Sequence, residues 1–321
     1  MFSIEPQNGV DKPQMAILVQ HLTLATGPNP PPPAGSSADM VLRRDDGTYG
    51  IYDIGNNRIL GSDQLGQVGT DWQFVGLGGF YGADTADMLL RNATTGGFEV
   101  YDISNNNITN AAFLGNVGMD WQVMGFGNFS SRGESDMLLR NSNTGGLEVY
   151  DIANNQITNA AFIGTVGLDW QFSGVGNFSS IPAETDLLLR NVNTGGLEVY
   201  DINNNQITGA AFLGTVGLDW QFAGVASIHG SGTTDLVLRN INTGQFEVYD
   251  IASNQITGAA LLGAVGLDWQ LGGFAVEQAA QLGQAMAGFG GGSGAAEPLN
   301  TPGLGAADTS QQAFLATSQH A

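Results

Sequence analysis

The sequence predicts an all-β fold: a five-bladed β-propeller of four-stranded blades, with one blade completed by both ends of the repeat array. Two repeated signals and the composition support it. The dipeptide Asp-Trp recurs every 49 or 50 residues, and strings of the type DMLLRN recur at a matching interval. Periods of about 40 to 50 residues with several short strands are typical of propeller blades. Glycine supplies 48 of 321 residues and charged residues only 12%, which favours many tight turns over helices.

One repeat unit divides into four strands. The stretch Trp121–Phe129 is apolar with alternating glycines, of which Gly125 should allow a close backbone approach. A loop leads to DMLLRN, which starts at Asp136, and the turn NTGG at 143–146 contains the paired glycines that hairpin turns require. The strands LEVYDI and ITNAAFIG follow, separated by the turn ANNQ. These strands are apolar on both faces, as expected for a blade between two neighbours.

The ends of the array predict how the fifth blade is made. The first unit begins at Asp39 with the second strand and lacks a Trp-led strand. An orphan copy of that strand, Trp269–Val276, follows the last complete hairpin. Adding the orphan to residues 39–66 makes one composite blade and satisfies an otherwise unpaired edge. The alternative is an open array or a multimeric ring.

The domain organisation follows from these limits. Residues 39–276 form the predicted propeller. Residues 1–38 form an N-terminal segment that ends in a Pro-rich linker at 25–37. Residues 277–321 are predicted as a short helix at 277–289 and a flexible Gly/Ala-rich tail.

Composition excludes several classes of protein. The chain has no Cys, so disulfides, Cys-based metal sites and thiol nucleophiles are impossible. A net charge of -21 repels phosphate backbones, so we expect no nucleic-acid partner. The longest early apolar stretch, Met15–Leu24, is far shorter than the roughly 20 residues needed to span a bilayer. No membrane span is expected.

The motif order resembles a known family. The succession of GNF at 127–129, DMLLRN, NTG and VYDI resembles the bacterial FG-GAP/VCBS-like repeat family of β-propellers, over about residues 39–276. The resemblance implies extracellular or surface proteins that act in adhesion, recognition or scaffolding. It also implies a calcium-type loop before the second strand of each blade.

Those loops depart from the calcium pattern. Arg132 stands among the would-be ligands Asn128, Ser130 and Asp136, and a cation opposes calcium there. The next copy has Ile181 and Pro182 where a ligand and a glycine belong. We therefore expect no metal site and no cofactor, with the loops held by hydroxyl and amide caps. Calcium remains the alternative.

A repeated rim is the candidate ligand-binding site. Strand order places the NTGG turn and the start of the Trp-led strand at one end of each blade. Tryptophan beside Asp, Asn and backbone donors can stack on a sugar and orient its hydroxyls. The structural alternative is that Asp-Trp caps a turn and that the arginines pair with Glu99, Glu148, Glu198 and Glu247. The candidate residues are Asp71, Trp72, Asp120, Trp121, Asp169, Trp170, Asp219, Trp220, Asp268, Trp269, Arg91, Asn92, Arg140, Asn141, Arg190, Asn191, Arg239 and Asn240.

Nothing in the sequence supports catalysis. The three histidines, His21, His229 and His320, have no ligand spacing, and no nucleophile elbow or phosphate-binding loop is present. We expect a non-enzymatic binding propeller, secreted or surface-exposed, that recognises glycans or a protein partner. The alternative is an assembly scaffold whose tails make the contacts. The sequence does not fix the oligomeric state.

The export route is predicted from composition and termini. The chain is acidic, has one lysine, and begins without a basic stretch leading into an apolar run, so a cleaved secretory signal is not expected. This combination resembles substrates of type I secretion, whose signal lies at the C-terminus; Ala307–Ala321 is the candidate. A cytoplasmic location is the alternative.

Overall fold

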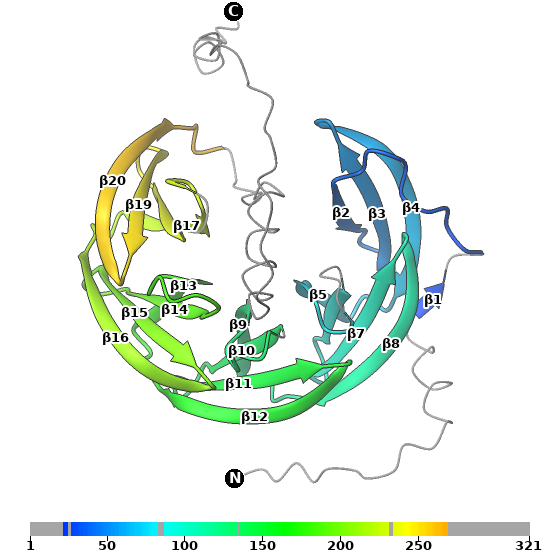
Figure 1. Ribbon diagram of the computed structural model, residues 1–321, viewed down its shortest axis with the longest axis horizontal. Helices are drawn as coiled ribbons and strands as arrows, with labels where there is room; N and C mark the ends of the chain where they lie inside the picture. The colour runs from blue at the N-terminus through cyan, green and yellow to red at the C-terminus, as the bar shows by residue number, and fades with distance from the viewer. Residues whose placement is uncertain (1–21, 25–26, 83–86, 134, 231–233, 269–321) are drawn as a thin grey trace, which may run out of the picture. The chain divides into compact units, whose positions relative to one another are not determined.

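The computed structural model describes residues 22–24, 27–82, 87–133, 135–230 and 234–268 (Figure 1). Every regular element in this part of the chain is a β-strand, and the strands form five four-stranded antiparallel sheets. The chain is therefore a five-bladed β-propeller, as the repeats predict. Among the same residues there is no helix of the length and hydropathy that would cross a bilayer.

The blades are numbered along the chain, and the same four roles recur in blades 2 to 5. The innermost strand comes first in each of these blades and the outermost strand comes last (Figure 1). Blade 1 contains β1 (Leu22–Leu24), β2 (Ala38–Arg43), β3 (Thr48–Gly55) and β4 (Arg58–Val68); blade 2 contains β5 (Trp72–Gly78), β6 (Asp87–Asn92), β7 (Gly97–Ser104) and β8 (Asn107–Asn116); blade 3 contains β9 (Trp121–Gly127), β10 (Asp136–Asn141), β11 (Gly146–Ala153) and β12 (Gln156–Thr165); blade 4 contains β13 (Trp170–Gly176), β14 (Asp186–Asn191), β15 (Gly196–Asn203) and β16 (Gln206–Thr215); blade 5 contains β17 (Trp220–Ala226), β18 (Asp235–Asn240), β19 (Gln245–Ala252) and β20 (Gln255–Ala264).

The turns confirm the hairpin predictions. Asn154 and Asn155, between β11 and β12, have φ angles of 50° and 58°, as the mirror-image turns of tight hairpins require. Gly145 in the NTGG turn has a φ of 75°, and a Cβ there would lie 1.9 Å from the carbonyl oxygen of Val166. Only glycine fits that position.

Glycines on the innermost strands let neighbouring blades approach closely. A Cβ on Gly125 of β9 would lie 2.9 Å from Val175 on β13 of the next blade, and one on Gly174 would lie 2.6 Å from Val225 on β17. The predicted close approach at Gly125 is confirmed. Its consequence is that the valine side chain of one inner strand packs directly against the glycine backbone of the preceding blade.

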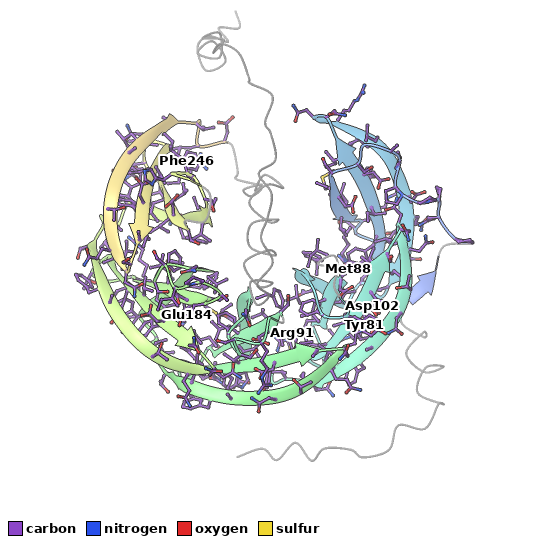
Figure 2. The ribbon with its side chains drawn as sticks, viewed as in Figure 1. Tyr81, Met88, Arg91, Asp102, Glu184 and Phe246 are labelled. Atoms are coloured by element: carbon purple, nitrogen blue, oxygen red, sulfur yellow. The ribbon has the colours of Figure 1, made fainter. Side chains whose placement is uncertain are left out.

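The cores lie between blades. Each of the four buried clusters combines the facing sides of two consecutive blades; Leu89 of β6, for example, packs with Met137 and Leu139 of β10. Met88 and Asp102 both lie in blade 2 (Figure 2). Burial of complete Leu, Met and Phe side chains stabilises each junction by roughly 1.5–3 kcal/mol per side chain.

A polar bond, here called the interblade latch, accompanies each of these cores. The second residue of the hairpin turn, in each case an Asn, donates its Nδ2 to an Asp carboxylate on the preceding blade, over 2.6–3.1 Å. The four latches are Asn106–Asp53, Asn155–Asp102, Asn205–Asp151 and Asn254–Asp201. A buried carboxylate is thereby satisfied by an amide donor.

Blade 1 differs from the others in its fourth strand. β1 pairs antiparallel with β4, with Leu22 opposite Val68, and is therefore the outermost strand of blade 1. Asn29 anchors the following segment, since its backbone N–H donates to Asn107 Oδ1 over 2.6 Å. The predicted partner for β2, Trp269–Val276, lies outside the described residues, as do the predicted helix at 277–289 and the tail.

Candidate functional site

The Asp and Asn residues of the candidate rim are joined to each other. In blade 3, Asn141 Nδ2 donates to Asp120 Oδ2 over 2.6 Å, while Asn141 Oδ1 accepts from the backbone N–H groups of Asn143 and Thr144 over 3.0 Å. The same bonds recur around Asn92, Asn191 and Asn240. One Asn side chain therefore fixes both the turn and the start of the Trp-led strand.

The arginines link consecutive blades through backbone carbonyls. Arg140 Nη2 donates to the Gly167 carbonyl over 2.8 Å, and Arg190 Nη2 donates to the Gly217 carbonyl over 2.9 Å. Arg91 and Arg239 make the corresponding bonds to Gly118 and Gly266. Arg140 and Arg190 thus donate to backbone carbonyl oxygens of the next blade. The alternative arrangement, in which they form ion pairs with Glu148 and Glu198, is not found among the described residues.

The glutamates instead accept from tyrosines two residues along the same strand. Tyr150 donates its hydroxyl to Glu148 Oε2 over 3.0 Å, and Tyr249 does so to Glu247 over 2.7 Å. Burial, followed by the charge of Glu198, raises the pKa of Tyr200 to about 12. These Tyr–Glu pairs lie on the third strands of the blades, and we assign them a structural role.

The tryptophans are packed against the blades. Trp72 is 4% exposed, and Trp121, Trp170 and Trp220 are half-buried against the interblade cores. Asp268 is exposed at the end of the described chain, and Trp269 lies beyond it.

The calcium-type loops are closed by their own hydrogen bonds. Asp186 Oδ2 accepts from the backbone N–H groups of Phe178 and Ser179 over 2.8 Å. Asp136 likewise accepts from Ser130 N–H, and Arg132 points to Asp151, with Nη1 3.5 Å from the carboxylate. Among the described residues no group of three or more acidic or His side chains is arranged to hold a metal.

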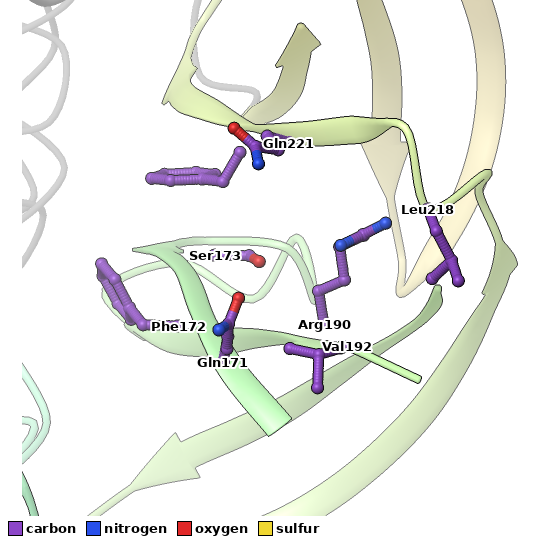
Figure 3. Close-up of a pocket in the computed structure, with 8 residues that line it drawn as sticks. Gln171, Phe172, Ser173, Arg190, Val192, Leu218 and Gln221 are labelled. Atoms are coloured by element: carbon purple, nitrogen blue, oxygen red, sulfur yellow. The ribbon is translucent and has the colours of Figure 1, made fainter. Parts of the chain in front are cut away.

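A pocket of about 400 Å³ lies between blade 4 and blade 5, and sequence reasoning missed it. Its walls come from the neighbouring inner strands β13 and β17 and from the end of β14 (Figure 3). The lining residues are Gln171, Phe172, Ser173, Arg190, Val192, Leu218, Gln221 and Phe222. The predicted rim residue Arg190 thus belongs to this pocket.

Ser173 lies at a variable position of the repeat. The fourth residue of the Trp-led strand is Val75 in blade 2, Met124 in blade 3 and Ala223 in blade 5, and both Val75 and Met124 pack against interblade cores. In blade 4 it is a serine that is 1% exposed, and its hydroxyl has no hydrogen-bond partner among the described residues. A short polar side chain in place of a long apolar one leaves both space and an unsatisfied donor.

Polar groups converge on this space. The exposed carboxamides of Gln171 and Gln221 face each other across the pocket (Figure 3), and neither makes a hydrogen bond with another described residue. Arg190 is the charged residue of the lining, and burial lowers the pKa of its guanidinium against the opposing charge of Asp219. Phe172 and Phe222 pack edge to face, with ring centres 6.0 Å apart. The pocket can thus bind hydroxyl, carbonyl or carboxylate oxygens beside an apolar wall.

The comparisons with known proteins are limited to the fold. No protein-family model matches the chain, so its resemblance to the FG-GAP/VCBS-like family is not confirmed, and no curated protein matches it. Among solved structures, the chain is similar to the dihydro-haem d1 dehydrogenase NirN in complex with DHE, at 12% identity and a TM-score of 0.40, covering 76% of this chain and 57% of that one.

Two further structures are equally distant. A post-proline cleaving enzyme from Rickettsia typhi is 11% identical, with a TM-score of 0.40, over 77% of this chain and 40% of that chain. A nidogen/laminin complex is 14% identical, with a TM-score of 0.35, over 69% of this chain and 93% of that one. The chain thus spans about half the length of the first two proteins.

Proposed function

We propose that this chain is a non-catalytic binding propeller and that it recognises a glycan in the pocket between β13 and β17. One observation carries the proposal: the pocket lies beside Ser173, at a position that differs in every blade and carries a hydroxyl in blade 4 alone among the described strands. Residues that recur in every blade serve the blade, whereas a unique residue with a buried, unpartnered hydroxyl is free to serve a ligand.

The chemistry of the pocket favours a saccharide. Carboxamides accept and donate to vicinal hydroxyls, a guanidinium binds ring, hydroxyl or carboxylate oxygens, and the face of Phe222 can pack against the apolar face of a sugar ring. The lining contains no carboxylate or imidazole to activate Ser173, which favours binding over reaction. We also propose that the chain is a member of the FG-GAP/VCBS-like repeat family and that it functions outside the cell.

A glycan array with the full chain tests this proposal, followed by titration of the best saccharide against two variants. Ser173→Met fills the pocket with the side chain that blade 3 already accommodates, and Gln171→Ala removes one carboxamide. We expect each to weaken saccharide binding at least tenfold, with melting temperatures close to that of the parent chain. Gln122→Ala changes the equivalent residue of blade 3 and should leave binding unchanged. Undiminished binding by Ser173→Met would place the ligand elsewhere.

Protein binding is the second candidate, supported by exposed apolar side chains on the outer strands. Phe162 on β12 and Phe212 on β16 occupy equivalent positions and are each 63% exposed. Phe162 and Trp121 both lie near Gly146, so apolar groups gather beside the turn. Such clusters are typical of protein contact surfaces. The test is the double variant Phe162→Ser with Phe212→Ser. If the parent chain binds no glycan and the double variant loses self-association or partner capture, the scaffold function is favoured.

A further inference from the structure

A segment ahead of β2, here called the N-terminal strap (residues 28–33), lies across the outer junction of blades 1 and 2. Its Asn29 donates its backbone N–H to Asn107 Oδ1 over 2.6 Å and accepts from Asn107 Nδ2 at its carbonyl over 3.1 Å. The side chain of Asn29 donates its Nδ2 to the carbonyls of Gln64 and Asn106, over 2.9 and 2.6 Å. The junction therefore binds both the backbone and the amide side chain of one residue.

A proline of the strap packs against the backbone of β4. A Cβ on Gly61 would lie 3.0 Å from Cγ and 3.3 Å from Cδ of Pro33, so a side chain there would crowd the proline. Gly61 has no positive φ, and the same position holds Asn110 in blade 2 and Asn159 in blade 3. The backbone thus does not require a glycine at this position, whereas the close contact with Pro33 does.

The outer junction of blades 4 and 5 repeats the parts of this site. β16 and β20, the outermost strands of these blades, lie beside each other (Figure 1). Residues of β16, of β20 and of the turn before β20 hold the register positions of those that contact the strap. Gly61, Gln64, Asn106 and Asn107 correspond to Gly209, Phe212, Asn254 and Gln255, here called the outer site. None of the outer-site residues lines the pocket between β13 and β17.

The junctions of blade 2 with blade 3 and of blade 3 with blade 4 lack the glycine. Asn110 and Asn159 stand there, and Asn159 Nδ2 donates to Asp151 Oδ2 over 3.2 Å. A side chain at this position takes the room that Pro33 occupies beside Gly61. Apart from the junction that the strap fills, only that of blades 4 and 5 combines the glycine with the carboxamide, among the junctions that described latches join.

The carboxamide of the outer site is open to a ligand. Gln255 is exposed and makes no hydrogen bond with another described residue, whereas Asn107, which contacts the strap, is half-buried. A carboxamide has the donor and the acceptor that match a backbone carbonyl and N–H group. β16 and β20 contain no charged residue, in a chain of net charge -21. An uncharged segment can therefore lie on them without burying a charged side chain of either strand.

We propose that the outer site binds an extended, uncharged segment of a partner protein in which an Asn is followed by prolines, as Asn29 is in the strap. Gln255 bonds to the backbone of that Asn, the carbonyls of Phe212 and Asn254 accept from its side chain, and a later proline packs against Gly209. Proline-rich segments suit this role because their extended conformation is largely formed before binding, which lowers the entropy cost. This interaction is independent of the glycan pocket.

Titration of the full chain with a fluorescent peptide, followed by anisotropy, tests the proposal. The peptide is GPNPPPPAG, the sequence of residues 27–35. Gly209→Asn gives blade 4 the residue that blades 2 and 3 already accommodate, and it should weaken binding about tenfold. Gln255→Ala removes an exposed side chain and should weaken binding about fivefold. Gly258→Asn makes the same change in blade 5, outside the outer site, and should leave binding unchanged.

A second peptide tests recognition of the amide. With Asp in place of its Asn, the peptide has no donor for the carbonyls of Phe212 and Asn254, so we expect about tenfold weaker binding. Equal binding of the two peptides would overturn the proposed mode. Melting temperatures close to that of the parent chain show that the variants are folded.

Weaker binding by both Gly209→Asn and Gln255→Ala, with Gly258→Asn unchanged, supports the outer site. Undiminished binding by Gly209→Asn and Gln255→Ala overturns it, as does the absence of binding at about 1 mM peptide. If Asn107→Ala abolishes binding while Gly209→Asn does not, the peptide replaces the strap at blades 1 and 2, and the proposal fails. A dimer of the full chain that Gly209→Asn abolishes would assign the outer site to the strap of a second copy and overturn the choice of a partner protein.

Discussion

Asn141 shows how much of the rim depends on a single side chain. Its amide holds Asp120 with the donor and two turn N–H groups with the acceptor. A short amide at the end of the second strand can therefore fix the hairpin turn within the blade and the start of the Trp-led strand at once. The consequence is that repeated polar residues on a propeller rim need not face a ligand.

Removal of this side chain should be strongly destabilising. Asn141→Ala leaves the Asp120 carboxylate and two backbone donors without their partner, so we expect the free energy of unfolding to fall by about 2–3 kcal/mol. Asn143→Ala, two residues along the same turn, removes an exposed side chain with no side-chain hydrogen bond and should stay within about 0.5 kcal/mol of the parent. Urea unfolding of both variants measures the difference; equal losses would contradict the role of Asn141.

Asp186 should couple stability to pH. Burial is the main cause that raises its pKa to about 6, against the N–H groups of Ser179 and Phe178. The pKa of an unfolded Asp is about 3.9. Because the pKa is higher in the folded chain, the contribution of Asp186 to stability is fully present below about pH 3.9. It is lost as the pH rises through about 6. Asp186→Asn should therefore shrink the gain in unfolding free energy between pH 7.5 and pH 5. Asp45→Asn removes an exposed charge and controls for net charge.

At the scale of the strand, the inner glycines set the distance between blades. Gly125→Ala would place a methyl group 2.9 Å from Val175, so the blades must shift and we expect a loss of about 1–3 kcal/mol. Gly50→Ala is the matched control, because its Cβ would meet its nearest neighbour at 3.5 Å with no positive φ. Thermal melts compare the two; a neutral Gly125→Ala would contradict close packing at the inner strands.

The loops before the second strands should be indifferent to calcium. Their Asp carboxylates already accept backbone N–H groups, and Arg132 reaches Asp151 from the loop of blade 3. Melting curves in excess EDTA and in millimolar calcium should nearly coincide. A large upward shift with calcium would reveal a site formed by other carboxylates.

The strands, turns and blade order could be predicted because five copies repeat the same local signals. The pocket could not, because the effect of Ser173 depends on which face of β13 meets β17. The interblade latches also escaped prediction, since they join residues 53 or 54 positions apart across a junction. β1 is a three-residue strand without a repeat partner, and so short a stretch carries no periodic signal.

At the scale of the whole molecule, the last repeat unit should be needed for cooperative unfolding. Truncation after Gly263 removes the end of β20, Asp268 and residues 269–276, which the sequence predicts to complete blade 1. The free edges and exposed apolar faces should then either unfold in several steps or associate between copies. Calorimetry with light scattering tests this expectation. A truncated monomer with an unchanged single transition would contradict closure by the C-terminal strand.

The inner edge of β2, which pairs with no strand in the described part of the chain, has a consequence for synthesis of the chain. β2 leaves the ribosome more than 220 residues before Trp269, so its edge waits while four further blades are translated. Strand edges that stay unpaired during synthesis favour aggregation of nascent chains. β2 carries Asp39 at one end and Arg43 followed by Arg44 at the other, whereas β6, β10, β14 and β18 end in Arg-Asn. A charge at this place is of the kind that disfavours edge-to-edge association of strands.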